Sequence, residues 1–365
     1  MSMSAVPAGR LKSLDIFRGG TIASMILVNN PGTWKEVYPP LRHAVWHGWT
    51  FTDTVFPFFL WIVGLAVTLS TAKRVAAGQD KKQLLMHGAR RAAILFALGL
   101  FLTLFPHFDF VNIRIPGVLQ RIAVCYLIAL AIFLWSGWRG LIAWAVGLNV
   151  VYLALMLFYP VPGCGSGSWV MECNFARFID GHLLAGHMWS STKDWDPEGV
   201  VSTLPAIATV LLGMLAGYML RSDGTGMEKI RRFMLAGFAM VAAGVALESI
   251  VPINKALWTT SFVLLMAGLA SICFVVWYWV ADIKGWAVWL KPFEVYGMNA
   301  IAAYMLSGLL ADIMGVTKWQ PWAFQNLCLP LASPVNASLI YALGNVAVVY
   351  AVVYLMYRRG WFVRL

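Results

Sequence analysis

Polar residues are concentrated between two strongly apolar segments near the N-terminus. This stretch, residues 29–53, contains Asn29, His43 and Asp53, together with a second asparagine and a second histidine. Histidine exchanges protons near neutral pH, and an amide side chain can donate a hydrogen bond to a developing oxyanion. We therefore expect the chemistry in this stretch, where His43 could serve as a base, Asn29 could donate to an oxyanion and Asp53 could orient the imidazole. Capping of a helix N-terminus is an equally good interpretation of Asp53.

The elements that hold these residues are predicted to be membrane helices. Of the 365 residues, 60% are hydrophobic and only 12% are charged, and a bilayer core needs about 20 apolar helical residues per span. We predict an all-α, polytopic membrane helical bundle that forms one domain over residues 1–365. Its ten expected spans are 14–30, 51–72, 89–106, 116–136, 139–159, 200–220, 232–251, 258–281, 295–315 and 336–357.

Nineteen of the 27 Lys and Arg residues fall in every second loop or at the termini, seven fall in the other loops, and Arg121 lies within a span. The positive-inside rule then places both termini in the cytoplasm and the longest loop, residues 160–199, outside it. The first segment lacks a cleavage signal, so we expect it to be retained as a span. The net charge of +11 is explained by topology and by contact with anionic lipid, and we expect no nucleic-acid partner.

Two cysteines, Cys164 and Cys173, share the long outer loop. In an oxidising compartment they are expected either to form a disulfide or to remain as two free thiols, and the spacing leaves both open. The spacings of His, Cys and carboxylate residues match no metal site, and we expect no metal.

Several motifs occur in a fixed order along almost the whole chain. They are residues 10–19, the two segments around Asn29 and His43, and residues 115–123, 195–206, 257–262 and 297–300. Together they resemble the heparan-α-glucosaminide N-acetyltransferase family and its bacterial transmembrane relatives. The family's active-site histidine falls on His43 and its catalytic asparagine falls on Asn29.

The resemblance implies transfer of an acetyl group from cytoplasmic acetyl-CoA, across the membrane, to the amine of a glucosamine. It also implies a bacterial inner-membrane location and a possible homodimer. The acceptor stays open between free glucosamine, a peptidoglycan fragment and a longer glycan.

Coenzyme A would have to reach from the cytoplasm toward His43, and four polar residues are expected along that path: Arg121, Gln120, Asn299 and Arg18. Arg121 lies a few residues into the fourth span, where a cation normally faces a polar cavity or an acidic partner. An interhelical salt bridge is the structural alternative for Arg121.

For the acceptor we expect contacts from Asp196, Glu198 and Trp46. Two carboxylates outside the membrane could hold a cationic amino sugar, and capping of a positive helix end explains them equally well.

A transporter of an amino sugar is the alternative from another class. It would use Arg121 and Glu248 as intramembrane charges and would break its helices at Pro57 and Pro116, although no inverted repeat supports it. An acyltransferase with a different envelope-glycan acceptor is the third hypothesis.

Overall fold

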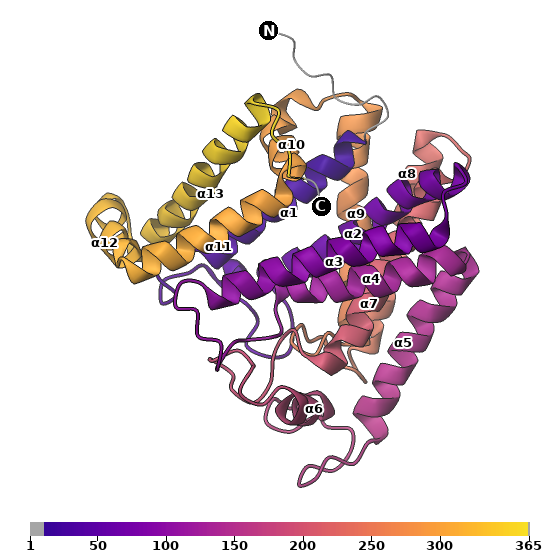
Figure 1. Cartoon of the computed structure of the whole chain (residues 1–365), viewed down its shortest axis with the longest axis horizontal. Coiled ribbons are helices and arrows are strands. Elements are labelled where there is room, and N and C mark those ends of the chain that lie inside the picture. The colour runs from indigo at the N-terminus through magenta and orange to yellow at the C-terminus, as the bar shows by residue number, and fades with distance from the viewer. Residues whose placement is uncertain (1–10, 364–365) are drawn as a thin grey trace. The chain divides into compact units, whose positions relative to one another are not determined.

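The computed structural model describes residues 11–363 and consists of helices joined by loops (Figure 1), which confirms the expected all-α class. The long helices are α1 (Lys12–Asn29), α2 (Phe51–Ala76), α3 (Lys81–Leu104), α4 (Val118–Trp135), α5 (Trp138–Phe158), α7 (Val200–Arg221), α8 (Gly226–Leu247), α9 (Thr260–Tyr278), α11 (Ala300–Val316) and α13 (Pro334–Arg358). The shorter ones are α6 (Phe175–Leu183), α10 (Lys291–Met298) and α12 (Trp319–Ala323).

Within residues 11–363, eight helices are long and apolar enough to cross a membrane: α2, α3, α4, α5, α7, α8, α9 with its extension to Ile283, and α13. The chain is therefore an integral membrane protein. A ninth candidate, expected as one continuous span over 295–315, is broken at Asn299, where the helices on either side are bent by 74°. The segment expected as the first span forms the 18-residue helix α1, which is not among these eight because it carries three charged residues.

The chain divides into two compact units. Unit 1 contains residues 11–43, 50–55 and 273–363, and unit 2 contains residues 44–49 and 56–272. The prediction of one domain over the whole chain stays a prediction.

In unit 1, α1 and α10 pack closely through two glycines. A Cβ at Gly19 would lie 1.7 Å from the carbonyl oxygen of Phe293, and a Cβ at Gly297 would lie 1.9 Å from that of Asp15. Neither position accepts a larger residue at this separation, so the glycine of the 297–300 motif is explained by helix packing. The N-terminus of α1 is capped by Asp282, whose carboxylate accepts hydrogen bonds from the N–H groups of residues 12 and 13.

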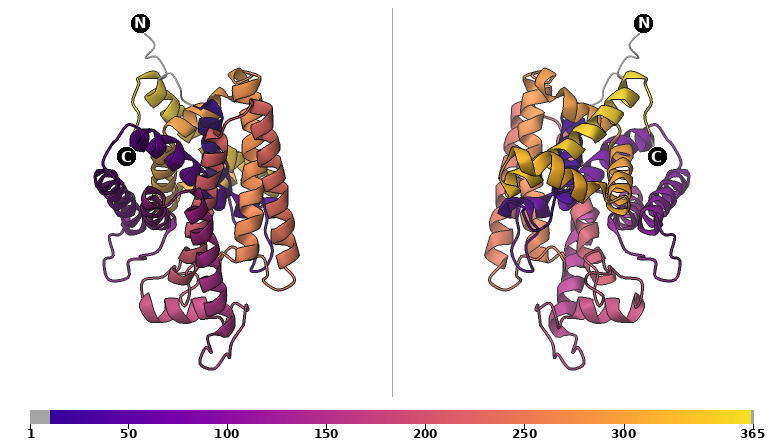
Figure 2. Two further views of the ribbon diagram at one scale, coloured as in Figure 1. Left: turned by 90° about the vertical axis from the view of Figure 1, so that its right-hand side faces the viewer. Right: turned by 90° about the vertical axis from the view of Figure 1, so that its left-hand side faces the viewer.

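In unit 2, α3 lies beside α4 and α5 lies beside α7 (Figure 1). Helices α2 and α7 approach closely, since a Cβ at Gly64 or Gly213 would lie 2.0 Å from a carbonyl oxygen of the other helix. Figure 2 shows the short helix α6 lying across the direction of the long helices of this unit.

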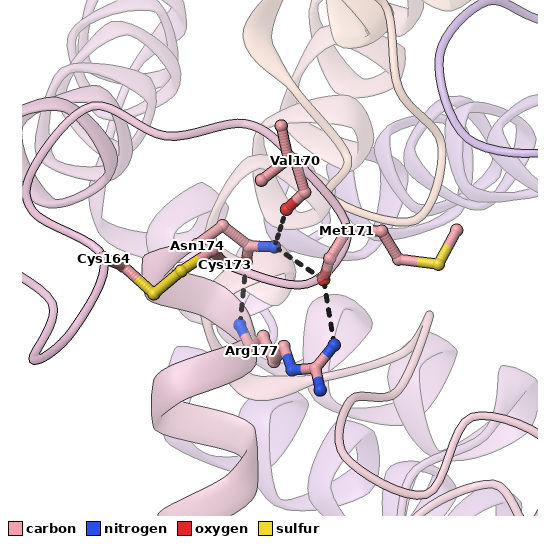
Figure 3. Close-up of a disulfide and its surroundings, with 6 residues drawn as sticks. All are labelled: Cys164, Val170, Met171, Cys173, Asn174 and Arg177. Atoms are coloured by element: carbon pink, nitrogen blue, oxygen red, sulfur yellow. Dashed lines mark hydrogen bonds between the residues drawn. A yellow bond between two sulfur atoms is a disulfide. The ribbon is translucent and has the colours of Figure 1, made fainter.

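The loop around α6 contains a disulfide between Cys164 and Cys173, with the two Cα atoms 5.7 Å apart (Figure 3). Of the two alternatives left open by the sequence, the structure contains the bonded one. Asn174 follows directly and caps α6, because its side chain accepts the N–H of Arg177 and donates to the carbonyl oxygen of Val170. The disulfide and the cap together order the start of α6.

Candidate active site

His43 and Asp53 form a hydrogen-bonded pair in unit 1. The distance from Nδ1 of His43 to Oδ1 of Asp53 is 2.7 Å. The Asp53 side chain is 1% exposed, whereas the imidazole of His43 is 45% exposed. A buried carboxylate thus fixes one ring nitrogen of a histidine whose side chain remains accessible. This is the contact that was expected from the sequence.

Asp53 also caps the start of α2, so the two interpretations of this residue are compatible. Its second carboxylate oxygen accepts hydrogen bonds from the N–H of Thr50 (3.0 Å) and from the Thr50 hydroxyl (3.2 Å). The Thr50 hydroxyl also donates to the carbonyl oxygen of Arg42, and Thr52 donates to that of Pro40. These bonds hold residues 40–43 against the first turn of α2. The histidine is therefore preoriented through its backbone as well as through its ring.

The other part of the same loop is anchored on α13. Gly32 donates its N–H to the carbonyl oxygen of Ser338, and Thr33 exchanges hydrogen bonds with the Ser338 hydroxyl. The hydroxyl of Tyr38 donates to Asn336 over 2.6 Å. Gly32 is required here because a Cβ would come within 2.5 Å of the Phe324 ring. The loop between α1 and α2 is thus fixed at both of its ends.

Asn29 is the last residue of α1 and is exposed, in the same unit as His43. Its neighbour Asn30 is buried, and its amide donates to the carbonyl oxygen of Ile26 and to the hydroxyl of Ser307. Asn30 therefore stabilises the end of α1, while the catalytic role of Asn29 stays a prediction.

A second polar cluster lies in unit 2, where Arg114 binds both carboxylates that were expected to contact the acceptor. Its guanidinium forms a bidentate pair with Asp196 (2.8 and 2.7 Å) and a third bond with Glu198 (2.6 Å). Asp196 also accepts the backbone N–H groups of Trp189 and Glu198. Burial disfavours the charged form of Arg114, but the bonds and charges of the two acids outweigh it and raise its pKa.

Arg121, in the first turn of α4, is 2% exposed. One of its nitrogens, Nη2, donates to the carbonyl oxygen of Gly199 (3.1 Å) and to the hydroxyl of Ser202 (2.5 Å), and its guanidinium lies over the Trp258 ring. Among residues 11–363, no group accepts a hydrogen bond from its Nε or Nη1. Arg121 therefore joins the starts of α4 and α7 by hydrogen bonds to neutral groups. Its other two nitrogens have no hydrogen-bond acceptor within the described residues.

Asp180 of α6 completes the cluster. Its carboxylate accepts the N–H groups of Val200 and Asp196, so it caps the start of α7. Burial raises the pKa of Asp180 to about 6, although these two hydrogen bonds and the charge of Arg121 act in the opposite direction. Gly199 leaves room for the carboxylate, because a Cβ there would lie 2.0 Å from it.

Trp46 and His47 both lie in unit 2. The indole N–H of Trp46 donates to the carbonyl oxygen of Trp169. The Trp46 ring packs edge-on against the Trp195 ring, with the two ring centroids 5.2 Å apart. Burial lowers the pKa of His47, which favours its neutral form. The contact of Trp46 with an acceptor stays a prediction.

The three other residues predicted along the coenzyme A path lie in different surroundings. Gln120 is buried against Gly99 and Gly117, and no group among residues 11–363 accepts a hydrogen bond from its amide nitrogen. Asn299 is fully buried at the helix break and bonds the backbone of residues 361 and 363. Arg18 donates to Asp15 and to the carbonyl oxygen of Gly297.

Sequence reasoning missed several residues that organise these sites. Thr50 and Trp258 both lie inside the recognised motifs, so their positions could have indicated that they belong to these sites. Arg114 directly precedes the 115–123 motif. Its pairing with acids more than 80 residues away has no local signature, because it depends on how α4 and α7 pack.

Chemically, the His43–Asp53 pair can accept a proton from a nucleophile, and the carboxylate can stabilise the imidazolium that forms. The Arg114 cluster holds its carboxylates in charge-assisted bonds, which favours a structural role.

Known proteins are similar to this chain over the region that contains the His43–Asp53 pair and the Arg114 cluster. A family model described as "Heparan-alpha-glucosaminide N-acetyltransferase, catalytic" matches residues 10–251. The chain is 31% identical over 356 residues to the heparan-alpha-glucosaminide N-acetyltransferase of Mus musculus, a match that covers 82% of this chain and 53% of the mouse protein. It is 30% identical over 363 residues to that of Homo sapiens, covering 83% of this chain and 53% of the human protein. The aligned region thus spans about half the length of these relatives.

Proposed function

Because the chain belongs to the heparan-α-glucosaminide N-acetyltransferase catalytic family, we propose that it transfers the acetyl group of acetyl-CoA to the amine of a terminal or free glucosamine. The observation that carries the proposal is the bond between the accessible imidazole of His43 and the buried carboxylate of Asp53. It supplies a proton acceptor, which acetylation of a protonated amine requires.

In the proposed reaction, the amine nitrogen attacks the thioester carbonyl carbon. A C–N bond forms, the C–S bond breaks, and coenzyme A leaves as a thiol. The ammonium group of the acceptor first releases one proton to bulk water. His43 then takes a second proton from the nitrogen as it attacks and returns it to the leaving sulfur, while Asp53 keeps the ring in one orientation. The side-chain amide of Asn29 donates a hydrogen bond to the oxyanion of the tetrahedral intermediate. Direct transfer in a ternary complex is our preferred order, with an acetyl-histidine intermediate as the alternative.

Arg121, Gln120, Asn299 and Arg18 are the residues that we propose for coenzyme A. The buried nitrogens of Arg121 and Gln120 that lack a hydrogen-bond partner within residues 11–363 support this choice, because such groups are usually satisfied by some acceptor. For the acceptor sugar we propose Asp196, Glu198 and Trp46, although Arg114 already forms ion pairs with the two carboxylates.

We further propose that acetyl-CoA is bound from the cytoplasm and the acceptor from the other side of a bacterial inner membrane, with both termini cytoplasmic. The alternation of basic loops supports this orientation. Single cysteines introduced near Lys81 should be labelled only from the cytoplasm, and those near Ser168 only from outside. Labelling of both positions from one side would overturn the orientation.

The transporter alternative finds one supporting feature, the 74° break at Asn299, since transporters often bind solutes at broken helices. The expected break at Pro57 is absent from the described chain, because α2 is continuous from Phe51 to Ala76. Uptake of a sugar without covalent change would favour this alternative.

The decisive experiment is to incubate the purified protein with labelled acetyl-CoA and a panel of amino sugars, and to identify products by mass spectrometry. Acetylated glucosamine, or an acetylated glucosamine-terminated glycan, is the expected product. A panel in which no amine gains the label would overturn the proposal. Size measurement in detergent would test the proposed homodimer.

A further inference from the structure

Two arginines, Arg90 and Arg91, lie within α3 of unit 2, a helix that is long and apolar enough to cross a membrane. Residues 92–104 complete this helix, contain no charged side chain and are about 20 Å long. The hydrocarbon core of a bilayer is about 30 Å thick. The helical turns that carry the two arginines therefore cross roughly the last 10 Å of the core.

No carboxylate on the neighbouring helices compensates these two charges. α3 lies beside α4 (Figure 1), α7 packs on α4, and none of these three helices contains an acidic residue. Among residues 11–363, neither guanidinium forms a hydrogen bond or an ion pair, and the Nε of Arg91 is buried without an acceptor. A cation at this depth normally has an anionic or polar partner. That partner must come from outside residues 11–363.

Tyr126 of α4 fixes the position of Arg91. The guanidinium lies over the Tyr126 ring, with its Cζ atom 5.1 Å from the ring centroid. The two helices approach closely at Gly88, where a Cβ would lie 2.2 Å from the Leu130 side chain and 3.4 Å from the Tyr126 hydroxyl. The ring covers one face of the guanidinium and leaves its edge available. The N–H groups on that edge match a pair of oxygen atoms on one ligand.

The direction of α3 indicates which anion meets these arginines. The Cα–Cβ bonds of an α-helix tilt toward its N-terminus, and the N-terminus of α3 at Lys81 is the end nearer to both arginines. Long cationic side chains in such a position extend along the helix into the headgroup region. Phosphate is the anionic group that lipids place in that region.

We infer that Arg91, with the exposed Arg90 beside it, binds a phosphate group at this edge of the bilayer. A guanidinium and a phosphate form paired, charge-assisted hydrogen bonds, which are among the strongest in proteins. Two sources can supply the group: the headgroup of an anionic phospholipid and the phosphates of coenzyme A. Only the second source rests on the proposed function, because phospholipid surrounds any integral membrane protein.

The experiment uses the full-length protein in detergent and has one arm for each source. Phosphatidylglycerol is titrated beside diacylglycerol, which lacks the phosphate, and coenzyme A is titrated beside pantetheine, which also lacks it. Native mass spectrometry measures the bound lipid, and calorimetry measures the bound cofactor.

Arg91→Gln should weaken about tenfold the binding of the phosphate-bearing ligand in one arm and leave both phosphate-free counterparts unchanged, because a charge-assisted pair is lost. Arg91→Lys keeps the charge but loses the paired geometry, so it should weaken the same ligand by only about threefold. Loss in the phosphatidylglycerol arm would assign the site to lipid, and loss in the coenzyme A arm would assign it to the cofactor. Either result supports the inference.

Arg139→Gln is the matched control. The guanidinium of Arg139 also lies over an aromatic ring, that of Trp138, at 5.2 Å, but Arg139 is exposed at the start of α5. This variant should bind all four ligands as the wild type does.

Three results would overturn the phosphate site. They are unchanged binding of both phosphate-bearing ligands in Arg91→Gln, equal loss of a ligand and its phosphate-free counterpart in both Arg91 variants, and equal loss in Arg139→Gln. Acetyl transfer is measured on the same samples. An active wild type with unchanged binding in the Arg91 variants would leave the proposed function standing without the site. An inactive wild type that loses phosphatidylglycerol in Arg91→Gln would support the site and overturn the proposed function.

Discussion

Two buried carboxylates, Asp53 in unit 1 and Asp196 in unit 2, have different partners. Asp53 bonds His43, whose side chain is 45% exposed and can gain or lose a proton. Asp196 bonds Arg114, whose side chain is 24% exposed and whose charge is permanent, and it also accepts two backbone N–H groups. The pair in unit 1 can therefore change its protonation state during a reaction, while the cation that pairs with Asp196 in unit 2 is permanent.

This difference teaches how to assign roles to buried acids in a chain that has several of them. Burial is the same in both regions, so it does not separate a catalytic acid from a structural one. The bonding partner separates a catalytic acid from a structural one, because only a titratable partner allows proton transfer. Substitutions in the two regions should accordingly affect different measurements, with activity changing in the first and stability in the second.

The largest effect is expected for His43→Ala. Removal of the proton acceptor should lower acetyl transfer by roughly 10² to 10⁴ while the protein stays folded and binds acetyl-CoA. His47→Ala is the control and should cost much less. Steady-state rates with saturating acceptor measure the effect, and full activity in His43→Ala would break the assignment of unit 1 as the reactive region.

Asn29→Ala should lower the rate by about 10² to 10³, because one donor to the oxyanion is lost. The thermal midpoint should not change, since Asn29 is exposed. Asn30→Ala provides the contrast: Asn30 is buried between α1 and Ser307, so that variant should lose stability. If Asn29→Ala lost stability and Asn30→Ala lost activity instead, Asn30 would be the catalytic asparagine and Asn29 the structural one.

Arg114→Met should destabilise the protein by about 3–5 kcal/mol, because it leaves Asp196 and Glu198 without their cation. The midpoint of thermal unfolding in detergent should fall by on the order of 10 °C. Arg177→Met is the matched control, since its partner Asp194 is 62% exposed and the pair is worth less than about 1 kcal/mol. A stable Arg114→Met variant with lost activity would place unit 2 in the chemistry and remove the contrast.

Asp180 gives the pH test of the same cluster. Its pKa is raised to about 6, so between about pH 4 and 6 the folded protein binds a proton that the unfolded chain has released. This contribution to stability is present at low pH and is lost as the pH rises through 6, about 3 kcal/mol in all. Asp180→Asn should flatten the pH dependence of the unfolding midpoint in this range, whereas Asp194→Asn should leave the dependence in place.

The smallest effect is expected for Cys164→Ser combined with Cys173→Ser. The disulfide closes a loop outside the long helices, which satisfy their own backbone hydrogen bonds. Proteolysis of residues 160–199 should become faster, while the unfolding midpoint of the helices moves by only a few degrees. Non-reducing peptide mapping of protein from its native membrane should recover the linked pair.

The sequence by itself determined the helical class, most of the membrane helices and the segment that contains His43 and Asp53. These follow from local properties: apolar stretches of sufficient length, and polar residues packed into one short connection. The contact between His43 and Asp53 was also within reach, because His43 lies in the loop that leads into α2 and Asp53 follows ten residues later in the first turn of that helix.

Only the tertiary structure decided the partners of Asp196 and Glu198 and the break at Asn299. Arg114 meets Asp196 across 82 residues, and Asn299 bonds backbone more than 60 residues away. Charge pairing depends on which helix ends come together, and this depends on how the helices pack along their length, as α2 and α7 do at Gly64 and Gly213. Local sequence does not encode such distances, so it predicts which residues are polar but not which of them neutralise one another.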